Sequence, residues 1–251
     1  RIGEKGKTYS EKPTVNLKNL DIKSTSTRKP GVIEAGFAST ELDLNMRDVN
    51  LVWTSTVAIN KGAIVAGLSG KTTVLSLTMT DCIFDVTGAD GAKAIYAESG
   101  VSGALTFKTT TVKTKGAGAI KNSGMSLNID AASKFYHGET QSVALIDGVQ
   151  YSKFTDAVTA LNGKTENASL DIVGNVSISA NLTVKNTNGK NIVMDGNGHT
   201  ATVTAPILIS QHQGTVELKD LSEIFGDDEV TLKVEASGKD VKDGTYKAIV
   251  T

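Results

Sequence analysis

The chain repeats one apolar pattern five times near its start, and this repetition constrains the fold more than any other feature of the sequence. The copies begin 29, 33, 28 and 22 residues apart. A period in this range is typical of proteins in which each turn of chain stacks on the one before it, so we expect a solenoid. The five copies are Val15-Leu17-Leu20-Ile22, Leu44-Met46-Val49-Leu51, Leu77-Met79-Cys82-Phe84, Leu105-Phe107-Thr110-Val112 and the less regular Leu127-Ile129-Ala132.

Within each copy the apolar residues lie two, then three, then two positions apart. A spacing of two predicts strands, with the apolar side chains facing inward and polar side chains between them facing outward. The three-residue step contains Asn19, Asp48 or Asp81 in the first three copies. Asn and Asp tolerate left-handed backbone and bond to their own backbone, so the step predicts a tight bend between two strands.

A second apolar segment recurs further along each repeat and predicts a third strand per turn. Three short strands per turn indicate a parallel β-helix, in which successive turns pair about 4.8 Å apart. A helical solenoid would require a period of about 3.6 residues, which these segments lack. The recurring segments are Gly31-Val32-Ile33-Glu34-Ala35, Gly62-Ala63-Ile64-Val65-Ala66, Ala92-Lys93-Ala94-Ile95-Tyr96-Ala97 and Gly118-Ala119-Ile120.

Three segments of the sequence resemble the pectate-lyase-like right-handed parallel β-helix superfamily. Thr14-Val15-Asn16-Leu17-Lys18-Asn19-Leu20-Asp21 is similar to Thr215-Val216-Glu217-Leu218-Lys219-Asp220-Leu221-Ser222, and both resemble that family's coil consensus. A strand-and-turn segment common in the same proteins is similar to Ile192-Val193-Met194-Asp195-Gly196-Asn197-Gly198-His199-Thr200. The resemblance implies an all-β, right-handed fold. It does not select an activity, because the superfamily holds lyases, hydrolases, adhesins and proteins without known chemistry.

The pattern of apolar residues in the sequence changes near residue 140. We therefore expect two modules, residues 1–141 and 142–251. Val143 to Tyr151 predicts a hairpin around the Asp147-Gly148 turn. A short helix over residues 152–162 should follow, capped by Ser152, and is expected to cover an exposed coil end. A second, shorter run of coils then follows, with terminal strands between residues 230 and 250.

Composition excludes several partners. The chain has 26 basic and 27 acidic residues, a net charge of −1, and no basic run, which disfavours binding to nucleic acid. No apolar stretch approaches 18 residues, so we expect no membrane insertion, and no signal peptide is recognised. A chain that begins with Arg1 is expected to have been trimmed. The lone Cys82 occupies an inward position and should be a buried thiol.

The sequence contains no convincing catalytic or metal-binding constellation. Asp227-Asp228-Glu229 follows a glycine in a predicted loop, and His137, His199 and His212 lie far apart in the chain. Asp48 and Asp81 could stack with Asn19 and bind calcium, although hydrogen bonding at the bend explains them more simply. We therefore predict no catalytic residues, no metal and no cofactor, with calcium as the open alternative.

The outward positions of the first repeats form a grid with two informative columns. One column contains Asn16, Asn45, Thr78, Thr106 and Asn128, and its neighbour contains Lys18, Arg47, Thr80 and Lys108. Such a face could bind a glycan or an acidic polymer, although Asn and Thr ladders also suit exposed strands. Trp53 and Tyr96 could stack on sugars, with packing in the core or at an edge as the favoured alternative.

These observations predict a non-catalytic bacterial cell-surface or secreted β-solenoid for adhesion or glycan binding. Its partner would be a polysaccharide or a host-surface glycan. The alternative is a polysaccharide lyase or glycoside hydrolase acting on acidic polysaccharide, which would need a cleft with convergent acids and a basic group. The ligand and the oligomeric state stay open.

Overall fold

The computed structural model describes residues 12–25, 27, 31–36, 41–58, 60–67, 72–122, 124–186, 190–203, 205, 207–211, 215–219, 222–223, 231–236 and 244–247. These residues form an all-β protein with one short helix. The chain divides into two compact units. The first comprises Arg1–Gln141 and Gly148–Gln150, and the second comprises Ser142–Asp147 and Tyr151–Thr251.

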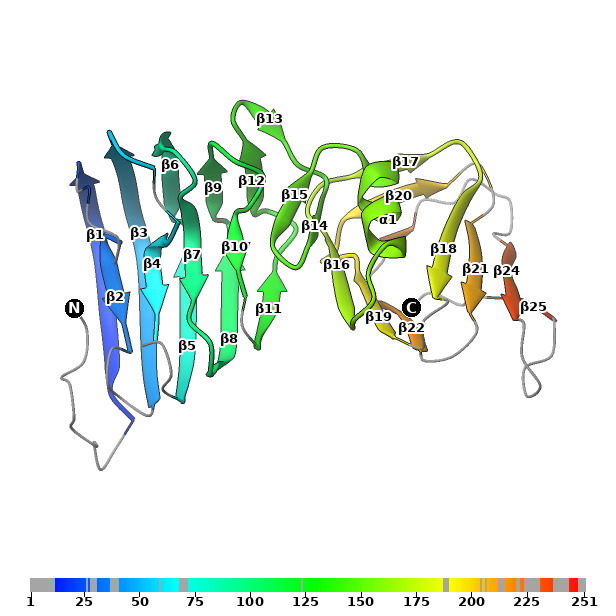
Figure 1. Cartoon of the computed structure of the whole chain (residues 1–251), viewed down its shortest axis with the longest axis horizontal. Coiled ribbons are helices and arrows are strands. Elements are labelled where there is room, and N and C mark those ends of the chain that lie inside the picture. The colour runs from blue at the N-terminus through cyan, green and yellow to red at the C-terminus, as the bar shows by residue number, and fades with distance from the viewer. Residues whose placement is uncertain are drawn as a thin grey trace. The chain divides into compact units, whose positions relative to one another are not determined.

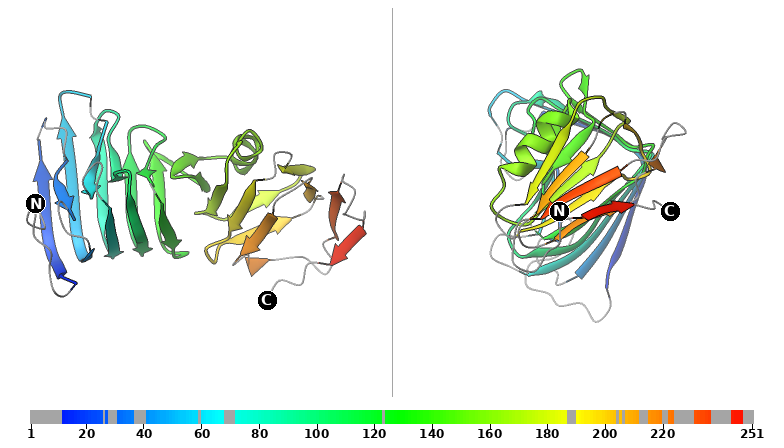
Figure 2. Two further views of the ribbon diagram at one scale, coloured as in Figure 1. Left: turned by 60° about the horizontal axis from the view of Figure 1, so that its bottom comes forward. Right: turned by 90° about the vertical axis from the view of Figure 1, so that its right-hand side faces the viewer.

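The larger sheet of the first unit is organised around two long strands (Figures 1 and 2). β1 (Thr14–Ser24) pairs in parallel with β3 (Glu41–Ser55) along nearly its whole length. β3 pairs through its first half with β5 (Thr73–Thr80) and through its second half with β6 (Ile83–Ala89). The remaining strands are β8 (Val101–Lys108) and β11 (Met125–Ile129) beyond β5, then β9 (Thr111–Thr114), β12 (Lys134–His137) and the antiparallel β13 (Thr140–Gln141) beyond β6.

The bend between the two halves is a left-handed residue in each of the first four repeats. Asn19, Asp48 and Asp81 have φ angles of 52°, 51° and 52°, which confirms the predicted bends. Thr109 takes the same place in the next repeat with φ 49°, although threonine gives no sequence signal for it. Short polar side chains at these positions let the strand turn without breaking the inward alternation on either side.

The recurring third segments form a second, parallel sheet of the first unit. Its strands are β2 (Ile33–Ala35), β4 (Gly62–Ala66), β7 (Lys93–Ala97) and β10 (Ile120–Lys121). Each pairs with the strand of the next repeat, as in Ile64 opposite Ile95. The chain therefore visits the two sheets in turn, and the predicted third strand is confirmed.

The core of the first unit consists of the inward residues of the repeats. Leu44, Leu77 and Leu105 are each 0% exposed, and Cys82 is a free, buried thiol as predicted. Phe107 and Phe135 meet edge to face with ring centroids 5.4 Å apart. This packing accounts for the spacing of the apolar pattern.

Two details of the repeat differ from the sequence prediction. Ala132 is exposed, because the bend of the fifth copy is one residue longer and places Ser133 and Phe135 inward instead. Leu20 is 40% exposed, while its register partner Val49 is 1% exposed. Leu20 lies on the edge strand β1, so one of its sides has no described neighbour.

The second unit contains the helix α1 (Phe154–Asn162). It begins after Lys153, without a side-chain cap, so the predicted cap at Ser152 is wrong. The hairpin turn is as predicted, with φ 49° at Asp147 and 79° at Gly148, between β14 (Ala144–Ile146) and β15 (Val149–Tyr151). The buried face of α1 comprises Phe154, Ala157, Val158 and Leu161.

Three small sheets complete the second unit. The core beneath α1 is formed by residues such as Ala144, Leu170, Val184 and Ile192. No helix among the described residues is long and apolar enough to cross a membrane. The strands are β16 (Ala168–Ile172), β19 (Asn191–Asp195) and β22 (Thr215–Lys219), joined by β14; β17 (Val176–Ile178), β20 (Thr200–Val203) and β23 (Ser222–Glu223); and β18 (Leu182–Asn186), β21 (Ile207–Gln211), β24 (Thr231–Ala236) and β25 (Gly244–Lys247).

Candidate binding face

The outward side chains of β1, β3, β5, β8 and β11 form what we call the outer face of the first unit. The strand register brings the two predicted columns together. The polar column runs through Asn16, Asn45, Thr78, Thr106 and Asn128, which are opposite one another in successive parallel strands. The basic column runs beside it through Lys18, Arg47, Thr80 and Lys108.

Hydrogen bonds between strands connect members of the polar column. Asn45 Nδ2 donates to Asn16 Oδ1 at 3.1 Å, and Asn128 Nδ2 donates to Thr106 Oγ1 at 3.4 Å. Each amide has two N–H donors and two acceptor lone pairs on its oxygen, so one bond leaves further capacity. Two pairs of neighbours in the column are therefore held by their own bonds, and their amides still have donors and acceptors to present outward.

The basic column presents three exposed cations. Lys18, Arg47 and Lys108 are exposed, and Thr80 between them is half-buried. Arg47 Nε lies 3.6 Å from Asp48 Oδ2, an exposed contact that contributes little. Within the described residues, neither Lys18 nor Lys108 takes part in an ion pair.

A third column of the outer face is already neutralised. Lys12 Nζ lies 2.6 Å from Asp43 Oδ1 and 3.4 Å from Ser76 Oγ. The hydrogen bond from Lys12 holds the pKa of Asp43 below its usual value, against a smaller opposing effect of desolvation. Asp43 therefore stays charged and does not compete for the basic column.

Trp53 is not part of this face, and the prediction that it could stack on a sugar is wrong. Its side chain is 0% exposed and lies in the core of the first unit. Trp53 shares the inward parity of Leu51, which explains its burial.

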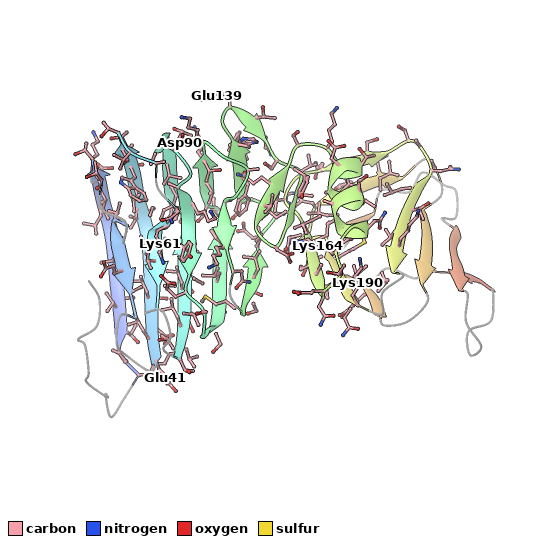
Figure 3. All side chains as sticks on the ribbon, in the orientation of Figure 1. Glu41, Lys61, Asp90, Glu139, Lys164 and Lys190 are labelled. Carbon is pink, nitrogen blue, oxygen red and sulfur yellow. The ribbon has the colours of Figure 1, made fainter. Side chains whose placement is uncertain are left out.

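Tyr96 lies on β7 in the other sheet of the first unit, so the structure does not place it with the two columns. Lys61 Nζ and Lys121 Nζ each lie 4.3 Å from the centre of its ring (Figure 3 labels Lys61). Lys121 Nζ also donates to the Tyr96 hydroxyl at 2.9 Å, and Lys61 forms an ion pair with Glu98. The ring is engaged in cation–π contacts, which leaves less of it to stack on a sugar.

The acidic residues considered for calcium lie at bends. Asp48 and Asp81 are exposed residues in left-handed conformation. Among the described residues, no group of three His, Cys, Asp or Glu side chains is arranged to hold a metal ion. His212 and the segment 227–229 lie outside the described residues. The Asp195-Gly196-Asn197-Gly198 phrase is a turn, in which Asn197 N–H donates to Asp195 Oδ1 at 2.9 Å.

Sequence reasoning missed a buried acid in the second unit. Asp171 on β16 is 3% exposed and accepts a hydrogen bond from Ser169 Oγ at 3.2 Å. Burial raises the pKa of Asp171 to about 7, and the charge of Asp195 adds to the shift. In the sequence Asp171 stands within the apolar run Leu170 to Val173, and only the pairing of β16 with β19 shows its neighbour. A polymer has no access to a carboxyl group this buried.

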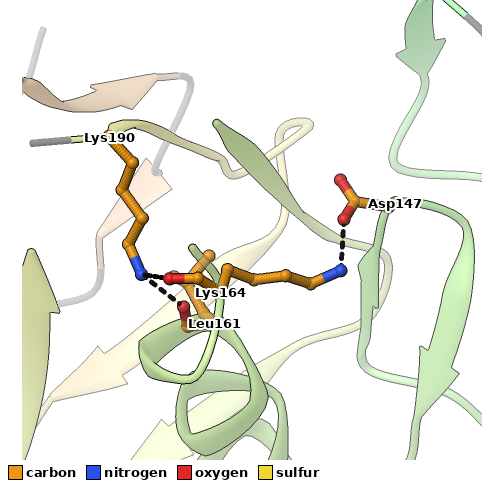
Figure 4. Close-up of polar contacts among 4 residues, drawn as sticks. All are labelled: Asp147, Leu161, Lys164 and Lys190. Carbon is orange, nitrogen blue, oxygen red and sulfur yellow. Dashed lines mark hydrogen bonds and ion pairs between the residues drawn. The ribbon is translucent and has the colours of Figure 1, made fainter. Parts of the chain in front are cut away.

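A second missed residue is the buried Lys190 (Figure 4). Its Nζ donates to the carbonyl oxygens of Leu161 at 3.0 Å and Lys164 at 2.6 Å, at the C-terminal end of α1. Burial lowers the pKa of Lys190, and the charge of Lys164 lowers it further. The contacts are those of a helix cap, and they do not suggest chemistry.

No family model, curated protein or solved structure matches this chain.

Proposed function

We propose that the first unit is a right-handed parallel β-helix of the pectate-lyase-like kind, and that the protein is a non-catalytic bacterial surface or secreted protein that binds glycans. The fold proposal is supported by successive parallel pairing at the spacing of the sequence repeat. The right-handed sense follows the general rule for parallel crossovers. Adhesion to a polysaccharide or a host-surface glycan is the role that fits such a face.

The observation that carries the binding proposal is the unbroken register of five strands beneath the polar column. Sugars are recognised by hydrogen bonds to their hydroxyl groups. The polar column places one amide or hydroxyl group on each successive strand, so it offers such donors and acceptors at a regular interval. Adjacent strands lie about 4.8 Å apart, which is comparable with the length of one sugar unit in an extended chain. A polysaccharide lying across the strands would therefore meet one equivalent side chain per strand.

The basic column favours an acidic glycan over a neutral one. Lys18, Arg47 and Lys108 lie on the same side of the polar column and are exposed. Carboxylate or sulfate groups on a bound polymer would form charge-assisted hydrogen bonds with them. Arg47 can make two parallel bonds to one such group.

The absence of enzymatic action is also part of the proposal. A hydrolase needs two accessible carboxyl groups across the scissile bond, and a lyase needs a base beside the substrate. On the outer face, Asp43 is paired with Lys12 and Asp48 stands at a bend. Within the described part of the chain, neither carboxyl group belongs to a cluster of acidic side chains.

A glycan array with acidic and neutral polysaccharides, run beside a turnover assay with and without calcium, tests this proposal. We expect saturable binding to acidic polysaccharides without product release. The triple variant Lys18→Ala, Arg47→Ala and Lys108→Ala should weaken binding at least tenfold. The matched control, Lys23→Ala, Lys113→Ala and Lys134→Ala, removes the same charge beyond the bend and should bind as the wild type does.

Two results would overturn the proposal. Calcium-dependent release of unsaturated products would favour the lyase alternative. Equal loss of binding in both triple variants would show that net charge, and not the outer face, attracts the polymer.

A further inference from the structure

The strand β1 leaves one edge unpaired in the part of the chain that the structure describes (Figure 1, dark blue). Its apolar side chains are also less covered than those of the next repeat. Leu20 is 40% exposed, and Val15, Leu17 and Ile22 are half-buried. Their register partners on β3 are at most 1% exposed. The core of the first unit is therefore open at this edge.

The backbone of β1 presents hydrogen-bonding groups along the open edge at known positions. Asp43 N–H donates to Pro13 O at 2.9 Å, so Pro13 points toward β3. Along a strand, successive residues direct their N–H and C=O groups to opposite sides, so residues two apart face the same side. Val15 and Leu17 therefore face β3 as Pro13 does, while Thr14 and Asn16 present N–H and C=O at the free edge.

The same assignment holds after the bend. Thr111 N–H donates to Cys82 O at 2.9 Å, so an inward residue directly after a bend points to the following strand. Leu20 occupies the place of Cys82 in the first repeat, because Leu20 is opposite Val49 on β3, and the residue after Cys82, Ile83, is opposite the residue after Val49, Asn50. The backbone N–H and C=O groups of Asp21 and Lys23 therefore face the free edge.

The apolar pattern of β1 reads the same in both directions. Its spacing of two, three and two residues places Val15 opposite Ile22 of an antiparallel second copy, and Leu17 opposite Leu20. This alignment also sets Thr14 opposite Lys23 and Asn16 opposite Asp21. These four residues are the ones whose backbone groups face the free edge, as an antiparallel hydrogen-bonded pair requires.

From this match we propose that two copies of the chain associate by antiparallel pairing of β1 with β1, about a two-fold axis that passes between Lys18 and Asn19 at the bend. One rotation then satisfies the edge hydrogen bonds and covers the exposed leucine. A two-fold axis makes the contact self-complementary and closed, so it yields a dimer and no fibre.

The charges and the geometry favour this pairing over the alternatives. No like charges stand opposite each other, since Lys23 meets Thr14, Asp21 meets Asn16 and Lys18 meets Asn19. Parallel pairing through the same edge would require a rotation about the strand direction. That rotation would turn the apolar face of one copy to the outside of the other.

The oligomeric state of the 251-residue chain, measured by light scattering after size-exclusion chromatography, tests the proposal with one substitution and its control. Asn16→Pro removes an N–H that faces the free edge and adds a ring there, which an edge strand tolerates. We expect the wild type to be a dimer and Asn16→Pro a folded monomer. Asn16→Ala keeps the N–H and should remain a dimer. A monomeric wild type, a dimeric Asn16→Pro or a monomeric Asn16→Ala would each overturn the proposal.

A second pair of measurements keeps the test decisive if the proline variant does not fold. Leu20→Lys is tolerated in a monomer, because the side chain is 40% exposed, but it would bury a charge against Leu17 of the second copy. It should shift the dimer dissociation constant at least tenfold. A spin label on Lys18→Cys, with Cys82 buried and unreactive, should report one short distance across the two-fold axis. An unchanged dissociation constant or the lack of that short distance would refute the antiparallel contact.

Discussion

Asp171 on β16 lies directly opposite Asp195 on β19, one strand away in a parallel sheet. Asp195 is half-exposed, while Asp171 is 3% exposed. Burial is the first cause of the raised pKa of Asp171, about 7, and hydrogen bonds from Ser169 and Asn197 oppose it in part. Asp171 is therefore protonated in the folded protein under mildly acidic conditions.

The stability of the second unit should fall as the pH rises from about 4 to 7. Below its ordinary pKa of 3.8, Asp171 is protonated in both states, and the contribution is fully present. Between 3.8 and about 7 the unfolded state releases the proton and the folded state retains it, so stability is lost with rising pH. At about 1.4 kcal/mol per pKa unit, the loss is at most about 4 kcal/mol.

Urea unfolding at pH 5 and pH 8, followed by hydrogen exchange of β16 and α1, checks this prediction. Asp171→Asn should remove most of the difference between the two pH values. Asp195→Asn should shift the pH range downward, because it removes a charge that raises the pKa of Asp171. A variant Asp171→Asn that keeps the full pH dependence would contradict the assignment to this residue.

Lys190 should contribute more to the free energy of unfolding than an exposed lysine does. Lys190→Met removes the donor to Leu161 O and Lys164 O and leaves the last carbonyl groups of α1 without that charged partner. We expect a loss of about 2–3 kcal/mol, as for hydrogen bonds from a charged group. Lys185→Met is the control, because Lys185 is exposed on β18. Thermal unfolding of both variants should separate them, and equal transition temperatures would argue against the cap.

The bend residue Asp81 should tolerate glycine and reject valine. Its φ of 52° costs a β-branched residue about 1–2 kcal/mol or more, while glycine adopts it freely. Asp81 is exposed, so neither substitution alters the core. Denaturant unfolding should rank Asp81→Gly close to the wild type and Asp81→Val clearly below it. Equal stability of the two would mean that the bend does not constrain the backbone.

The strands, bends and strand register of the first unit could be predicted because their determinants are local and repeated. The spacing of Leu44, Met46, Val49 and Leu51 specifies two strands and a bend, and aligning the same pattern between copies gives the register of the sheet. The chemistry of Asn19 and its equivalents marks the bend. The same alignment places the polar and basic columns of the outer face.

The features that sequence reasoning missed depend on contacts between distant segments or on a departure from the repeat. The bend of the fifth copy is one residue longer, and Ser133 fills the place expected for Ala132 because its hydroxyl accepts the N–H of Thr110 at 3.1 Å. Asp171 becomes notable only when β19 is placed beside it. Lys190 has no distinguishing signal in the sequence and acquires its role from carbonyl groups at and just after the end of α1, such as that of Lys164, which lies 26 residues earlier in the chain.

The inward register of the first unit leads to the last prediction, Leu44→Asp. Leu44 is 0% exposed, with Val15 and Leu77 as its register partners on the two neighbouring strands. An aspartate there would be an unpaired charge in the core, and we expect a loss of more than about 4 kcal/mol. Thr78→Asp is the control, because it introduces the same side chain on the outer face, where water solvates it.

Fluorescence of the single tryptophan, Trp53, reports unfolding of the first unit directly, since that side chain is 0% exposed. Leu44→Asp should show an exposed tryptophan or a much lower urea midpoint, and Thr78→Asp should stay within about 0.5 kcal/mol of the wild type. If Leu44→Asp were as stable as Thr78→Asp, Leu44 would not face the core. The columns of the outer face would then be displaced by one residue, and the basic column would no longer be presented to a glycan.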